Sequence, residues 1–153
     1  MSLPNVSADV VWEITRASNA FLVKRKTAGG GQFSRDPLNL TNKHSRKYAG
    51  FVNEKAVGVV PNEKGGVQVI SKKAGAHNKP ASGRATVTYG GNKTTRKTYK
   101  NIASQTAKTG YRPDLRQAAI ARASAIRRSQ RPVKPEPERK LRGTAAKKAA
   151  AEK

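Results

Sequence analysis

The chain has 153 residues, and its 32 Lys and Arg residues against 9 Asp and Glu residues give a formal net charge of +23. Such self-repulsion opposes compaction, so the composition argues against proteins that meet only water and metabolites and favours a polyanionic partner, nucleic acid before an anionic membrane surface. Cysteine is absent, which excludes disulfides and thiolate metal sites, and no stretch approaches the roughly 20 apolar residues of a membrane-spanning helix.

Residues 7–17 are predicted to form a short helix. Ser7 is a suitable N-cap, and apolar residues recur at helical spacing at Val10, Val11 and Ile14. Trp12 projects off this stripe, so it either packs against a second element or is available to stack on a base.

Phe21–Val23 is predicted to be a strand that runs directly into the basic triplet Lys24, Arg25 and Lys26. Such a triplet fits an RNA phosphate contact or a nuclear-import patch, and the two are compatible. Residues 27–47 have the Gly, Pro and Asn content of a loop, in which residues 32–34 are compatible with a short strand.

The clearest β signal lies in residues 48–60 and 66–72, where valines alternate with smaller or polar residues on both sides of a turn-rich connection. The pattern predicts an antiparallel hairpin. A third alternating run over residues 84–89 predicts a half-exposed strand, after a loop that contains His77.

Two basic amphipathic helices are predicted next. The first covers residues 93–109, with Gly110 as its C-cap. Tyr99, Ile102, Ala103 and Thr106 share one side of it, and Lys93, Arg96, Lys97, Lys100 and Lys108 share the other.

The second basic helix covers residues 111–131, with Pro113 at its first position and Pro132 ending it. Arginines cover the half opposite an apolar stripe, and Arg122 falls at the edge of the stripe. Arginine binds phosphate bidentately, although a solvated charged surface on a core helix is the plainer alternative. The stripe is formed by Leu115, Ala119, Ala123 and Ile126, and the opposite half by Arg116, Arg127, Arg128 and Arg131.

These elements predict an α+β fold, with a small antiparallel β-sheet, an N-terminal helix, two basic C-terminal helices and irregular extensions. Leu, Ile, Val and Phe together make up only about 17% of the chain, below the roughly 20% under which highly charged chains tend towards disorder. We therefore expect one thinly cored domain over residues 1–131 that its partner completes. Residues 132–153 are expected to be a basic, proline-broken tail, disordered or ordered by a partner.

No constellation of residues predicts catalysis. His44 and His77 stand singly in basic loops, and the carboxylates are scattered. Gly90–Thr94 lacks the glycine spacing of a phosphate-binding loop. We therefore expect no enzyme activity, no metal, no cofactor and no small-molecule substrate.

The segment YRPDLRQAAIARASAIRRSQRPV, residues 111–133, closely resembles the signature helix of the eukaryotic large-subunit ribosomal protein L28e family. The same order of motifs continues upstream in SNAFLVKR (residues 18–25), the DPLNL turn (residues 36–40), RKYAG (residues 46–50) and AVGV (residues 56–59). The resemblance covers roughly residues 6–133.

The resemblance implies a non-catalytic constituent of the cytosolic large (60S) ribosomal subunit, which binds large-subunit ribosomal RNA and neighbouring ribosomal proteins, with nucleolar passage during assembly. A nucleolar assembly factor that shares the domain is the nearest alternative, but it should end in a long acidic region, whereas this chain ends basic. A chromatin protein is a more distant alternative. The expected RNA-binding residues are Lys24, Arg25, Lys26, Arg46, Lys47, Lys93, Arg96, Lys97, Lys100, Arg112, Arg116, Arg122, Arg127, Arg128 and Arg131.

Overall fold

The computed structural model describes residues 6–27, 29–76, 79–137, 140 and 142–151. The predicted N-terminal helix is present as α1 (Ala8–Thr15), and the Ser7 side chain accepts a hydrogen bond from the Val10 N–H. Its apolar stripe is not buried, because Val10 is 50% and Ile14 73% exposed. Trp12 packs against the His44 ring, with the ring centroids 4.9 Å apart, so a second element does cover part of it.

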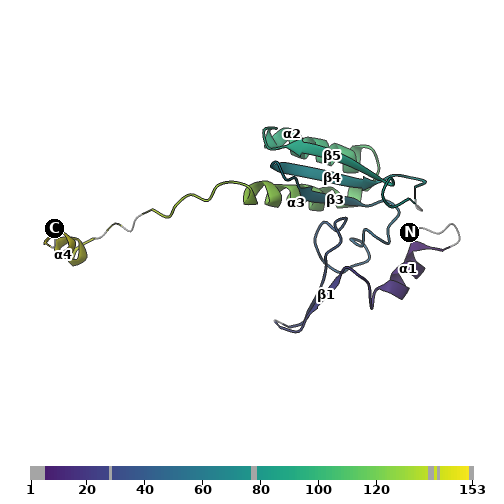
Figure 1. Ribbon diagram of the computed structural model, residues 1–153, viewed down its shortest axis with the longest axis horizontal. Helices are drawn as coiled ribbons and strands as arrows, with labels where there is room; N and C mark the ends of the chain where they lie inside the picture. The colour runs from purple at the N-terminus through teal and green to yellow at the C-terminus, as the bar shows by residue number, and fades with distance from the viewer. Residues whose placement is uncertain (1–5, 28, 77–78, 138–139, 141, 152–153) are drawn as a thin grey trace.

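The first two strands form a hairpin that projects from the rest of the domain (Figure 1). β1 (Leu22–Arg25) pairs antiparallel with β2 (Gly31–Ser34), in the register Leu22 opposite Ser34. β1 starts and ends later than the predicted strand, so Lys24 and Arg25 lie within it and not after it. The two strands form a sheet of their own.

The second sheet contains three antiparallel strands in the order β3 (Val57–Pro61), β4 (Gly66–Lys72) and β5 (Arg84–Gly90). The predicted hairpin and third strand are therefore confirmed. Gly58 is required in β3, because a Cβ at this position would lie 2.2 Å from the carbonyl oxygen of Pro37. The loop that contains Pro37 thus packs directly on the backbone of β3.

The prediction that the strand begins at residue 48 is wrong. The chain turns over residues 48–55, and β3 begins at Val57. The side chain of Asn53 donates hydrogen bonds to the carbonyls of Arg46 and Ala49, and the N–H groups of Val52 and Asn53 also bond to Ala49. These local bonds use the carbonyls that an extended strand would need for its ladder.

The first basic helix is α2 (Thr95–Ala103), and it continues through a π-helical turn, η1 (Ser104–Lys108). Gly110 ends it as predicted, with φ at 64° and its N–H bonded to the carbonyl of Ala107. Ile102 and Thr106 are buried, in agreement with the predicted apolar side. Thr98 is buried as well.

The second basic helix begins with a 3-10 turn, η2 (Pro113–Leu115), and continues as α3 (Arg116–Ser129). Its predicted stripe is confirmed, because Leu115, Ala119 and Ala123 are buried against the valines of β3 and β4. Small alanines let α3 approach the sheet closely. Helices α2 and α3 lie together on one face of this sheet (Figure 1), so the fold class is confirmed, with the strands divided between two sheets.

Beyond Ser129 the chain leads away from the domain and ends in a helix, α4 (Thr144–Ala151) (Figure 1). The sequence predicted a tail that is disordered or ordered by a partner. Alanine and lysine both have high helix propensity, which favours a helix in this segment. His77 lies outside the described residues.

Candidate nucleic-acid interface

Thirteen of the fifteen candidate cations divide into two groups, those whose charged ends face solvent and those whose charged ends bond to the chain itself. The other two, Lys47 and Lys93, lie beside aromatic rings. In the first group the side chains are exposed and form no hydrogen bond or ion pair with any residue that the structure describes. This group consists of Arg25, Lys26, Arg96, Lys97, Lys100, Arg116, Arg128 and Arg131.

The outward cations of α2 lie opposite its buried positions, and Arg128 lies opposite those of α3, while Arg116 is the exposed first residue of α3. Thr98 and Ile102 turn the other side of α2 towards the core, and Ala119 and Ala123 do the same for α3. Because the two helices pack side by side, their charged sides belong to one region of the surface. A region of this kind, with arginines and lysines free to pair, suits a phosphate backbone.

A second cationic region lies on the projecting hairpin. Lys24 and Arg25 are in β1, Lys26 follows it, and all three side chains are exposed. Lys24 also donates a 3.3 Å hydrogen bond to the carbonyl of Ala17. Two further candidates lie beside aromatic rings, with Lys47 Nζ 5.5 Å from the Tyr48 ring and Lys93 Nζ 5.8 Å from the Tyr89 ring.

Arg122 belongs to the second group. Its Nε donates to the carbonyl of Val59 at 2.7 Å, and its Nη1 donates to the carbonyl of Leu40 at 3.2 Å and to Asn42 Oδ1 at 3.0 Å. Burial lowers the pKa of its guanidinium. The side chain therefore joins α3 to the outer edge of β3 and to the loop before it.

Arg127 also bonds to backbone carbonyls of the chain, at the end of β5. Its two terminal nitrogens donate to the carbonyls of Gly90, Gly91 and Lys93, over distances of 3.1–3.3 Å. These carbonyls belong to the last residue of β5 and to the short connection that leads from it to α2. Arg127 thus holds that connection against α3.

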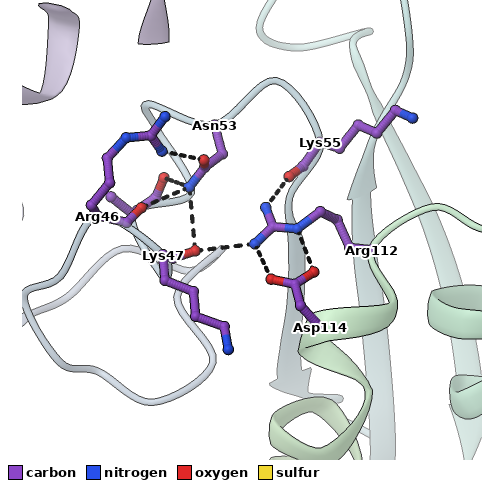
Figure 2. Close-up of polar contacts among 7 residues, drawn as sticks. Arg46, Lys47, Asn53, Lys55, Arg112 and Asp114 are labelled. Carbon is purple, nitrogen blue, oxygen red and sulfur yellow. Dashed lines mark hydrogen bonds and ion pairs between the residues drawn. The ribbon is translucent and has the colours of Figure 1, made fainter. Parts of the chain in front are cut away.

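Arg112 and Arg46 also bond internally (Figure 2). Arg112 donates to the carbonyls of Lys55 (2.8 Å) and Lys47 (3.3 Å), and it forms a bidentate pair with Asp114. Arg46 pairs with Asp9 at 2.8 Å and donates to Asn53 Oδ1. Together these contacts tie α1 and the turn at residues 46–55 to the start of η2.

These internal roles were not predicted from the sequence. For Arg122 a signal existed, because its position at the edge of the apolar stripe placed it partly inside. Lys72 was not predicted as a functional residue either, although its Nζ donates to the carbonyls of Phe51 and Asn53 and burial lowers its pKa. The exposed cations Arg35 and Arg84 were missed too, although Arg84 stands at an outward position of a predicted alternating strand.

The Arg112–Asp114 pair predicts a small acid dependence of stability. Hydrogen bonding to Arg112 is the main cause that holds the pKa of Asp114 below its usual value of 3.8. A carboxyl whose pKa is lower in the folded state than in the unfolded state stabilises the fold at pH values above its unfolded-state pKa. This contribution is lost as the pH falls through the folded-state pKa. Asp114→Asn should therefore cost stability at pH 6 but little at pH 2.5, measured by urea unfolding. In an Arg112→Gln background most of this pH-dependent cost should disappear, because Arg112 is the main cause of the lowered pKa.

Within the described part of the chain, no helix is both long and apolar enough to cross a membrane. No group of three or more histidine and carboxylate side chains there could hold a metal ion.

Comparison with known protein families identifies the family of this chain. The model of the ribosomal L28e protein family matches residues 10–129, which include every strand and the helices α2 and α3. The chain belongs to the ribosomal L28e protein family. The predicted resemblance is therefore confirmed.

Two curated relatives of the family share nearly their whole length with this chain, and a third shares about half. The large ribosomal subunit protein eL28 of Schizosaccharomyces pombe is 46% identical over 132 residues, which cover 85% of this chain and 97% of the relative. The protein of the same name from Dictyostelium discoideum is 35% identical over 90% of this chain and 98% of the relative. That from Trypanosoma cruzi is 37% identical over about half of each.

Proposed function

We propose that this protein is a structural constituent of the large subunit of the cytosolic ribosome, where it binds large-subunit ribosomal RNA through phosphate contacts. The relatives from S. pombe and D. discoideum are named as large ribosomal subunit proteins, which supports the assignment to the large subunit. The observation that supports phosphate contacts is the outward group of cations, whose charged ends lack any partner within the described residues. A chain with a net charge of +23 needs such a counter-charge.

Recognition proceeds by shape and charge, not by base sequence. A-form RNA hides its base edges in a deep, narrow major groove, so a helix surface meets phosphates and 2′-hydroxyls. The outward cations of the two helices bridge adjoining RNA backbones and screen their repulsion. These cations are Arg116 and Arg128 on α3 and Arg96, Lys97 and Lys100 on α2. In this proposal the protein performs no reaction. It is assembled into the large subunit in the nucleolus, and in the cytoplasmic ribosome it lies next to other ribosomal proteins.

Sedimentation tests the proposal. A tagged full-length chain expressed in eukaryotic cells is expected to co-sediment with large subunits and polysomes in a sucrose gradient, and to move with large subunits when EDTA separates them from small subunits. Confinement to nucleolar precursors would favour the assembly-factor alternative. A chain that remains at the top of the gradient would contradict both.

A further inference from the structure

The two outer edges of the β3–β4–β5 sheet differ, and the hydrogen bonds at the ends of its ladders show which backbone groups face outward. The N–H of Lys73 bonds to the carbonyl of Gly83 at 2.8 Å, just beyond the pair formed by Lys72 and Arg84. Hydrogen-bonded pairs alternate along an antiparallel ladder. The odd-numbered residues of β5 therefore bond to β4, and Arg84, Thr86 and Thr88 direct their N–H and C=O groups away from the sheet.

The opposite edge, on β3, is protected. The N–H of Lys72 bonds to the carbonyl of Ala56 at 3.2 Å, so by the same alternation Val57, Val59 and Pro61 face outward. Pro61 has no N–H to offer there. The carbonyl of Val59 is occupied by Arg122 at 2.7 Å. Proline and covering side chains are the usual means by which proteins prevent an edge strand from pairing.

The β5 edge has no such protection. It is seven residues long and contains no proline, and Thr86, Val87 and Thr88 are exposed. Among the residues that the structure describes, none bonds to the outward backbone groups of Thr86 or Thr88. A strand of this kind is a template for a further strand.

The positive charge around β5 favours an acidic partner. No acidic residue occurs between Lys64 and Pro113, a span that contains β4, β5 and α2. Arg84 lies at one end of β5, and Lys93 lies over the Tyr89 ring near the other. A backbone ladder requires a polypeptide, and this field favours one with carboxylates.

We propose that β5 is a docking edge, to which an extended acidic segment of a neighbouring protein adds as a further strand of the sheet. Backbone hydrogen bonds at Thr86 and Thr88 supply affinity, while Val87, which is 38% exposed, offers an apolar contact on the helix-covered face. The inference goes beyond the RNA contacts proposed above, because its hydrogen bonds come from backbone groups of β5 that those contacts do not use.

The test uses the full-length chain and a fluorescent ten-residue peptide in which valine and glutamate alternate. Saturable binding by fluorescence anisotropy is expected, with slowed amide hydrogen exchange at Thr86 and Thr88. Thr86→Pro removes one outward N–H while leaving the ladder to β4, and should weaken binding about tenfold. Thr86→Val keeps the N–H and should bind within about twofold of the parent chain.

A second control does not depend on the folding of any variant. The same peptide with N-methyl groups on alternate residues keeps its charge but loses its ladder donors, so it should bind the parent chain about tenfold more weakly. Equal binding of both peptides, absence of saturable binding, or protection of Thr86 and Thr88 by ribosomal RNA alone would overturn the proposal. Affinity of Thr86→Pro for ribosomal RNA, measured in parallel, should be unchanged, which separates this proposal from the RNA-binding one.

Discussion

Replacing five outward cations of α2 and α3 with glutamine is expected to reduce affinity for large-subunit ribosomal RNA on the order of 10³-fold at 0.15 M salt. Each neutralised phosphate contributes about 0.7–0.9 to the slope of log affinity against log salt, so five contacts contribute about 4. Over the interval from 1 M to 0.15 M salt, that slope amounts to roughly three decades of affinity. A filter-binding titration over several salt concentrations measures both quantities. The substituted residues are Arg96, Lys97, Lys100, Arg116 and Arg128.

The tail supplies a control with the same change in charge. Glutamine at five exposed tail cations also lowers the net charge from +23 to +18, because five positive charges are removed in each variant. Only the helix variant should lose most of the salt slope. Equal losses in the two variants would show that total charge, and not the α2–α3 surface, determines binding. The control residues are Lys134, Lys140, Arg142, Lys147 and Lys148.

Arg122→Ala is expected to lower the free energy of unfolding by about 3 kcal/mol. The substitution removes the donors to the carbonyls of Val59 and Leu40, two residues that are 0% and 4% exposed. Hydrogen bonds from a charged donor contribute about 1.5–3 kcal/mol, and the carbonyls left behind are poorly placed to find water. Urea unfolding followed by circular dichroism measures the change.

Arg128→Ala provides the matched control on the same helix. Its side chain is exposed and bonds to no described residue, so its removal should change stability by no more than about 0.5 kcal/mol. In RNA binding the order of the two effects should reverse. Arg128→Ala should lower the salt slope of binding, whereas the folded Arg122→Ala chain should retain the slope of the parent. An Arg122→Ala chain as stable as the parent would contradict the internal role of this arginine.

The sequence was sufficient where a local pattern decides the outcome. The alternating valines of β3 and β4 and the stripe at Leu115, Ala119 and Ala123 require one buried side whatever packs on it. Gly110 likewise ends the continuous helical run of α2 and η1, because the position needs a positive φ. The family resemblance of residues 111–133 was also visible in the sequence alone.

Only the tertiary structure determines whether each arginine of α3 faces solvent or bonds to the chain itself. In sequence, Arg116, Arg127 and Arg128 are equivalent cations on one helix, and only Arg122, at the edge of the apolar stripe, differs from them. All four were predicted to bind RNA. A guanidinium can reach phosphate or a backbone carbonyl, and the choice depends on which carbonyls the fold places within its reach. Those of Val59 and Gly90 come from strands more than thirty residues away in the chain, so no local pattern could have identified them.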